Sequence, residues 1–133
     1  MEAEGIYREA IERGIAEAYI GYGNLLSEKP TRRDEAENLY RRAIAAGLAN
    51  GHNNLATLLE DLERFGEAEE EFLRALDAGD SVAVRNYGLF LWDQGRLQEA
   101  ERYLQQALKA GDKRVKEELA ELRQEMTQET GLH

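Results

Sequence analysis

Cysteine is absent from this 133-residue chain, which also has only one proline and two histidines. Without cysteine there is no disulfide, no thiolate nucleophile and no thiolate metal ligand, which fits a reduced compartment. His52 is isolated and His133 is terminal, so the sequence offers no histidine-containing metal cluster. Ser27 and Ser81 have no histidine nearby, and neither a nucleophile elbow nor a phosphate-binding glycine loop occurs. We therefore expect a protein that is not an enzyme and that uses no metal or cofactor.

Positive charge and long apolar runs are also scarce. The chain has 17 Lys and Arg against 27 Asp and Glu, a net charge of −10, which argues against nucleic acid as a partner. No apolar run approaches the roughly 20 residues that cross a bilayer. Met1 leads directly into Glu-Ala-Glu without a basic segment, so we expect no signal peptide, no membrane contact and a cytoplasmic location.

What the chain has instead is an internal repeat. Glu-Ala-Glu occurs four times, and its central alanines are separated by 33, 32 and 32 residues. Other positions repeat in step. They are Ala3, Ala36, Ala68 and Ala100; Tyr7, Tyr40, Phe72 and Leu104; Ala10, Ala43, Ala75 and Ala107; and Gly14, Gly47, Gly79 and Gly111. A fixed period of this length is typical of stacked supersecondary units, because one such unit cannot bury its apolar face alone.

Each unit is predicted to contain two helices. Leu97, Ala100, Leu104 and Ala107 recur at three- and four-residue steps, which is one face of an α-helix, and the other three copies share this spacing. We call these the second helices. Between them lie first helices in which a large residue precedes a small one, and the small residue allows a neighbouring helix to approach closely. The predicted helices are 2–13, 15–28, 32–46, 49–62, 65–78, 81–93, 96–110 and 113–127.

Glycines and a short polar motif predict where these helices end. Gly79 and Gly111 are expected to end helices in the left-handed conformation. Gly66 and Gly95 are expected to mark the turns inside the second and third units, and Thr31 to Asp34 has the spacing of a capping box.

The third unit resembles a tetratricopeptide repeat. The residues that carry the resemblance are Val84, Tyr87, Gly88, Leu91, Gly95, Ala100, Leu104 and Ala107. Val84 replaces the usual tryptophan of the motif, and Asp80 or Asp112 replaces its closing proline. The Ala-Gly-Asp junctions at 78–80 and 110–112 instead resemble Sel1-like repeats, a related family, so both branches stay open.

The resemblance implies an all-α fold, a right-handed α-solenoid of antiparallel helix pairs. We expect one domain over 1–133 with a leading half-repeat, three full repeats, a C-terminal capping helix and a frayed tail. Their ranges are 1–14, 15–47, 48–79, 80–111, 112–127 and 128–133. In the cap, we expect Val115, Leu119, Leu122 and Met126 to face the preceding unit.

The resemblance also implies a function: a non-catalytic adaptor whose first helices line a concave groove that holds a peptide segment or a helix of another protein. Two alternatives remain open. The chain is a structural module that self-associates through its uncapped N-terminal end, giving a homo-oligomer, or it is an excised piece of a longer repeat array.

The groove positions of the family project onto residues of three successive first helices. They are Asn24, Asn53, Asn54, Thr57, Glu60, Arg85, Asn86, Leu89 and Trp92. Asparagine both donates and accepts hydrogen bonds, so a row of asparagines suits the backbone of an extended peptide. Trp92 is a candidate anchor, although it can also pack against a neighbouring unit. Equally, Asn54 and Asn86 can satisfy polar groups between helices.

Charge predicts which segments this groove prefers. Glu60, Asp61 and Asp93 make its floor acidic, which favours a basic or amphipathic segment, unless these acids serve only solubility. The basic positions of the clamp that chaperone-binding relatives use hold Ile20, Val82 and Asn86, so acidic chaperone tails are not expected to bind. The acidic stretch 67–71 lacks a calcium-loop pattern and is expected to be a solvated helix face.

Overall fold

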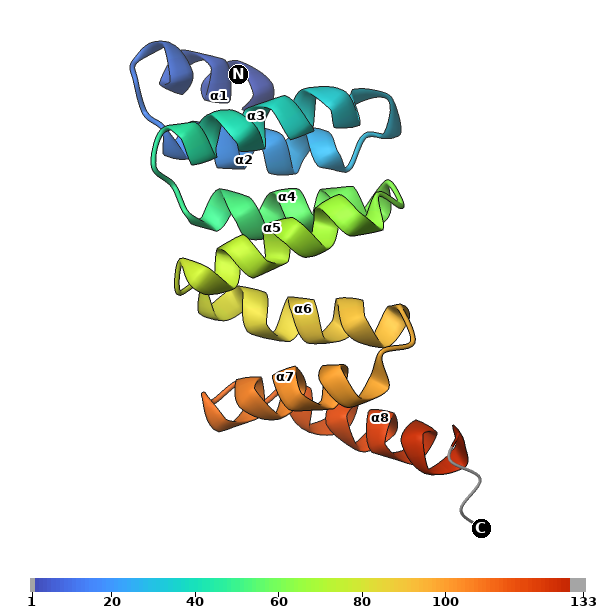
Figure 1. Ribbon diagram of the computed structural model, residues 1–133. Helices are drawn as coiled ribbons and strands as arrows, with labels where there is room; N and C mark the ends of the chain where they lie inside the picture. Colours follow the sequence, from blue (N-terminus) through green and yellow to red (C-terminus); the bar gives the residue numbers. More distant parts are fainter. Residues whose placement is uncertain (1, 130–133) are drawn as a thin grey trace. The chain divides into compact units, whose positions relative to one another are not determined.

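The computed structural model describes residues 2–129, which form an all-α fold without a strand (Figure 1). The helices are α1 (Ala3–Glu12), α2 (Glu17–Ser27), α3 (Arg33–Ala45), α4 (Asn50–Asp61), α5 (Phe65–Asp77), α6 (Ser81–Asp93), α7 (Leu97–Lys109) and α8 (Val115–Glu129). A short 3-10 helix, Pro30–Arg32, precedes α3. Every α-helix begins and ends within two residues of its predicted span, and the predicted helical-repeat class is confirmed. Residues 128 and 129 belong to α8 instead of a frayed tail, while 130–133 lie outside the described residues.

The chain forms two compact units, Met1–Asp80 and Ser81–His133, which are described separately. In the first unit α2 packs with α3 and α4 with α5, while α1 lies against α2 and α3 lies against α4. In the second unit α6 pairs with α7, and α7 also contacts α8. Each first helix therefore packs on its own second helix, as the sequence pattern predicts.

Small residues set the distance between paired helices. A Cβ atom added at Gly23 of α2 would lie 2.6 Å from Cε1 of Tyr40 in α3. At Gly88 of α6 it would lie 2.8 Å from Cδ2 of Leu104 in α7 and 3.3 Å from the Leu104 backbone nitrogen. The central alanines of the last three Glu-Ala-Glu motifs, Ala36, Ala68 and Ala100, are all completely buried. The pattern of a large residue followed by a small one thus marks positions where helices touch.

The turns follow the sequence with two exceptions. Gly14, Gly47, Gly79, Gly95 and Gly111 all adopt positive φ, as helix-ending and turn glycines should. Gly66 was expected to mark a turn, but it lies inside α5, and Glu63 makes that turn with φ at 59°. The capping box from Thr31 to Asp34 is also wrong. The 3-10 helix places Arg32 at the N-cap of α3, where no side chain caps the helix, because a guanidinium has no acceptor for a backbone N–H. The Arg32 guanidinium instead forms ion pairs.

These ion pairs explain the recurrence of Glu-Ala-Glu. An arginine precedes each of the last three second helices and contacts the first Glu of the motif three residues later. The pairs are Arg32–Glu35 at 2.9 Å, Arg64–Glu67 at 2.7 Å and Arg96–Glu99 at 2.8 Å. In the first unit, two of these arginines also bind the second Glu of the preceding motif. Arg32 contacts Glu4 at 2.7 and 3.0 Å, and Arg64 contacts Glu37 at 2.8 and 3.2 Å. We call this arrangement the arginine ladder.

The ladder shifts the acidity of its carboxylates. Hydrogen bonds from Arg32 and from the Tyr22 hydroxyl, which donates to Oε1 at 2.6 Å, lower the pKa of Glu4 from 4.5 to about 2. The pKa of Glu37 is lowered chiefly by its hydrogen bonds with Arg64 and, after that, with Arg41. Bidentate arginine–carboxylate pairs are among the stronger hydrogen-bonded contacts, so in the first unit the ladder ties α3 to α1 and α5 to α3.

Replacing Gly88 with leucine tests the close approach of α6 and α7. The added side chain meets the Leu104 side chain and backbone, so Gly88→Leu should lower the free energy of unfolding by about 1–3 kcal/mol. Gly66→Ala is the control, because Gly66 is helical with nothing within 4 Å of an added Cβ, and it should be neutral or stabilising by up to about 1 kcal/mol. Urea denaturation followed by circular dichroism measures both. Equal losses in the two variants would contradict the assignment of Gly88 to a helix contact.

The pKa of Glu4 predicts how the ladder responds to acid. A carboxylate with a lowered pKa in the folded state stabilises the protein above the unfolded value of 4.5, and this contribution disappears as the pH falls toward about 2. Glu4→Gln should therefore unfold at a lower temperature than the parent at pH 7, and the difference should shrink between pH 4.5 and 2. Glu12→Gln on the same helix, an exposed residue, is the control. A pH-independent difference for Glu4→Gln would rule out this role of the ladder.

Candidate functional site

Two of the predicted groove residues in the first unit already serve the fold. Asn24 is exposed at the end of α2, but its Oδ1 atom accepts a hydrogen bond of 2.6 Å from the Tyr40 hydroxyl of α3. Its NH2 group is therefore the part that can donate to a ligand. Asn53 is only 6% exposed, so it lies between helices and not on a ligand-binding surface.

The other candidates on α4 are partly exposed. The Thr57 hydroxyl donates to the backbone oxygen of Asn54 at 2.9 Å and to that of Asn53 at 3.3 Å, so it satisfies its own helix. Asn54 and Glu60 are half-buried. The part of α4 that a partner can contact therefore consists mainly of the Asn54 amide and the carboxylates of Glu60 and of Asp61, which is exposed.

In the second unit, two candidates bind acidic groups of the C-terminal helix. The Arg85 guanidinium on α6 donates to both carboxylate oxygens of Glu118 on α8, at 2.9 and 2.6 Å. The indole N–H of Trp92 donates to Oε2 of Glu125 at 2.7 Å. Asn86 and Leu89, between them on α6, are half-buried.

The sequence contains a signal for these contacts that the initial interpretation missed. Arg85 and Trp92 are seven residues apart on α6, and Glu118 and Glu125 are seven residues apart on α8. Seven residues make about two helical turns, so each pair lies along one side of its helix. Glu118 follows Arg85 by 33 residues, and Glu125 follows Trp92 by the same number, which is close to the repeat period. This spacing is expected because α8 follows α7 as a first helix follows the second helix of the preceding repeat, so equivalent positions of α6 and α8 lie at the same level.

α8 covers the end of the second unit as predicted. Val115, Leu119 and Leu122 are buried, while the Arg123 guanidinium reaches Glu101 of α7 at 2.9 Å. Arg123 occupies the repeat position of Leu26, Leu59 and Leu91, which are fully buried in the earlier repeats. A charged residue at this position gives α8 a polar outer face.

The first helices are strongly biased in charge. Neither α2 nor α4 contains Lys or Arg, and α6 contains only Arg85, whose charge is matched by Glu118. Asp61 and Asp93 are exposed where α4 and α6 end. An approaching ligand therefore meets acidic groups with few competing cations.

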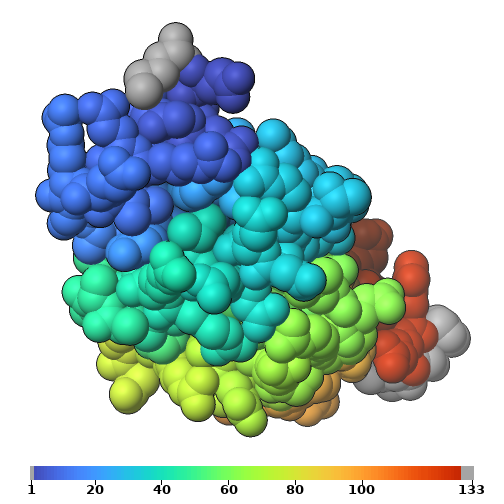
Figure 2. All heavy atoms as spheres, turned by 90° about the horizontal axis from the view of Figure 1, so that it is seen from above, coloured from blue at the N-terminus to red at the C-terminus, as the bar shows by residue number. Residues whose placement is uncertain are grey.

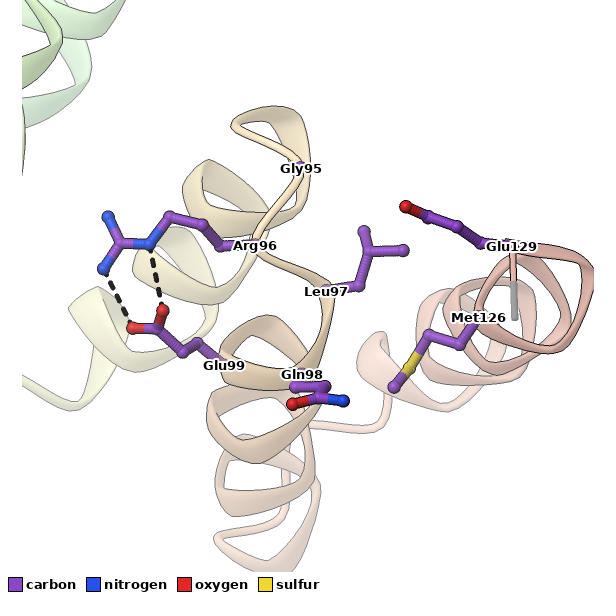
Figure 3. Close-up of a pocket in the computed structure, with 7 residues that line it drawn as sticks. All are labelled: Gly95, Arg96, Leu97, Gln98, Glu99, Met126 and Glu129. Carbon is purple, nitrogen blue, oxygen red and sulfur yellow. Dashed lines mark hydrogen bonds and ion pairs between the residues drawn. The ribbon is translucent and has the colours of Figure 1, made fainter.

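A pocket of about 380 Å³ lies between the start of α7 and the end of α8 (Figure 3). Leu97 and Met126 point into it, whereas Arg96 and Glu99 point away from it and pair with each other. Its other lining residues are Gly95, Gln98 and Glu129. The ionisable side chains of this lining are those of Arg96, Glu99 and Glu129.

Among residues 2–129, no group of three or more His, Cys, Asp or Glu side chains is placed to hold a metal ion. Among the helices described, none is both long and apolar enough to cross a membrane.

Comparison with known families agrees with the geometry. A tetratricopeptide repeat family model matches residues 31–83 and 53–115, which overlap and together span more than half of the chain. No curated protein matches the chain. The resemblance to Sel1-like repeats at the Ala-Gly-Asp junctions stays a prediction. The family match agrees with two features of the structure and sequence: paired helices that touch at small residues, and a repeat of 32 or 33 residues. The chain belongs to the tetratricopeptide repeat family.

Proposed function

We propose that this protein is a non-catalytic interaction module that binds a basic or amphipathic segment of another protein along its first helices. Tetratricopeptide repeats generally mediate contacts between proteins. The absence of cysteine favours a reduced, cytoplasmic setting for this contact.

The charge of the first helices is the observation that carries the proposal. Because α2 and α4 lack Lys and Arg, and because Glu118 matches the charge of Arg85, the exposed Asp61 and Asp93 attract cations with few competing positive charges on these helices. Complementary charge of this kind accelerates encounter and selects partners by the sign of their charge. The same excess of negative charge repels acidic tails. This agrees with the sequence, in which Ile20, Val82 and Asn86 occupy the positions where chaperone-binding relatives have basic residues.

Polar and apolar groups on these helices support a peptide ligand. In the first unit, the Asn54 amide can pair with a peptide backbone next to Glu60. In the second unit, Leu89 and the ring of Trp92 offer partly exposed apolar area, while the indole N–H stays bonded to Glu125. A segment with both basic and apolar side chains matches this combination.

Charge reversal on the first helices tests the proposal. The immobilised chain is used to capture partners from a bacterial lysate, and the affinity of a captured partner is then measured at low and high salt. Asp61→Lys/Asp93→Lys should weaken binding by about tenfold at low salt and by less at high salt. Asn54→Ala should also weaken binding, because it removes the peptide-facing amide.

Glu70→Lys/Asp77→Lys is the matched control, since both residues are exposed on the second helix α5 and the change in net charge is the same. This control should bind as the parent does. If both double variants lose affinity equally, the effect reflects net charge alone and the binding surface is not on the first helices. A captured segment rich in Asp and Glu would also contradict the proposal.

Self-association through α1 is the second candidate function, and one observation favours it. Ile6 on α1 is 52% exposed, whereas Leu39, at the same position of the next repeat, is 7% exposed beneath α2. Ile15, just after α1, is 49% exposed. Figure 2 looks onto this end of the first unit, where the atoms of α1 (dark blue) lie toward the viewer. Arg8 and Glu12 give α1 charges of both signs, so an antiparallel second copy meets opposite charges.

Sedimentation velocity over a wide concentration range tests this candidate. The parent should show a concentration-dependent dimer, and Ile6→Glu should remove it because the carboxylate would be buried in the contact. Leu73→Glu is the control, since Leu73 is 45% exposed on α5, away from this face. A parent that stays monomeric at every concentration excludes the candidate.

A further inference from the structure

One acidic residue of the second full repeat breaks the pattern of the array. Glu71 on α5 is only 4% exposed, although the acidic stretch 67–71 was expected to be a solvated helix face. Glu67 and Glu70 do face solvent. The equivalent positions in the other repeats hold Ile6, Leu39 and Tyr103, which are apolar or aromatic. The expectation is therefore wrong for Glu71, whose carboxylate lies where other units place an apolar side chain.

The carboxylate of Glu71 has two partners. Nδ1 of His52 on α4 lies 3.3 Å from Oε2, and Nη1 of Arg74 lies 2.9 Å from Oε1 and 3.4 Å from Oε2. His52 is itself a departure, because Tyr19 and Val84 occupy its position in the other full repeats. The second repeat thus places a polar pair at two positions where the other full repeats hold apolar or aromatic residues.

Stability does not explain this replacement. Burying a carboxylate carries a desolvation cost that a histidine and a partly exposed arginine offset only in part, and apolar replacements of buried ionic groups are often neutral or stabilising. The neighbouring repeats show that the helix pair forms with apolar residues at these positions. Departures from local folding rules concentrate at functional sites, which directs attention to what Glu71 and His52 face.

They face a pocket of about 310 Å³ that is lined by residues of α3, α4 and α5. Its lining consists of Arg41, Ile44, Ala45, His52, Glu71 and Arg74. None of the predicted groove residues of α4 lines it. We call it the Glu71 pocket, and it is a site separate from the proposed binding face of the first helices.

Two arginines and one glutamate line the Glu71 pocket, although the chain carries a net charge of −10. Arg41 and Arg74 outnumber Glu71, and His52 adds a further charge when it is protonated. Arg74 uses only Nη1 for Glu71, which leaves Nε and Nη2 to donate to a ligand. Arg41 donates to Oε2 of Glu37 from Nη2 at 2.9 Å and from Nε at 3.3 Å, but Glu37 also binds Arg64, so one carboxylate serves two guanidinium groups.

We propose that the Glu71 pocket binds an organic carboxylate. Arg74 and Arg41 donate hydrogen bonds to the carboxylate from two sides, and Ile44 and Ala45 contact the apolar body that carries it. Glu71 and His52 are positioning residues: Glu71 holds the Arg74 guanidinium at the pocket, and His52 holds Glu71. Two sources supply this chemistry, a free small carboxylic acid and the C-terminal carboxylate of a peptide.

Titration followed by ¹H–¹⁵N NMR on the whole chain tests the proposal with two probes. 3-Methylbutanoate represents a free acid, and acetyl-Gly-Gly-Leu with a free C-terminus represents a peptide. Saturable shifts of the Ala45, His52 and Arg74 amides, with a dissociation constant of about 1 mM, are expected for at least one probe. Response to the peptide alone assigns the pocket to a chain terminus, and response to 3-methylbutanoate as well assigns it to small acids. No saturable shift with either probe overturns the proposal.

Three variants and an uncharged probe separate recognition from general charge effects. Arg74→Gln should weaken binding about tenfold, and Arg42→Gln, an exposed arginine outside this pocket, should leave it unchanged. Glu71→Leu/His52→Val, which restores residues of the neighbouring repeats, should fold with an equal or higher thermal midpoint and lose binding. Equal effects of Arg74→Gln and Arg42→Gln, or equal binding of the peptide amide, overturn the proposal. Binding that survives in the Glu71→Leu/His52→Val variant overturns the positioning roles.

Discussion

The structure depends on the close approach of two helices at a position that carries no side chain or only a methyl group. In α2 and α6 this position is a glycine against Tyr40 and Leu104, and in the second helices it is the buried alanine of Glu-Ala-Glu. Because the contact fixes the distance between paired helices, it also fixes which side chains of neighbouring pairs can meet. The arginine ladder, the α6–α8 contacts and the Glu71 pocket all require that spacing.

Most of the fold was predictable because it follows from spacing alone. Apolar steps of three and four residues located every helix, and the terminal glycines located the helix ends. Glu63 was not predictable as a turn residue, because a non-glycine residue at positive φ is held by its surroundings and leaves no mark in composition. Gly66 wrongly predicted a turn, because an exposed glycine is also tolerated inside a helix and here lies in α5.

The candidate site was predictable as a surface but not as a set of contacts. Family positions placed Asn54, Leu89 and Trp92 on first helices, yet nothing in composition says that Asn53 is buried. Arg85 was predicted to contact a ligand, and Trp92 to be either an anchor or a residue packed on the neighbouring unit, but Glu118 and Glu125 were not identified as their partners. Glu71 was grouped with its acidic neighbours as one solvated helix face. Whether an acidic side chain is buried or exposed to solvent depends on the side of the helix on which it lies, so it must be judged for each residue separately.

The arginine ladder has a consequence for how such a chain grows. Each linking arginine lies at the start of its second helix, and the glutamate that receives the next arginine lies a few residues further along. In the first compact unit, the repeat that contains α3 therefore gives Arg32 to Glu4 of the repeat before it and receives Arg64 of the repeat after it at Glu37. Duplication of a 32-residue segment by recombination adds an arginine and a receiving glutamate together, and no charge is left without its counterpart. Arrays of different length can arise in one genetic step without a compensating substitution at the new boundary.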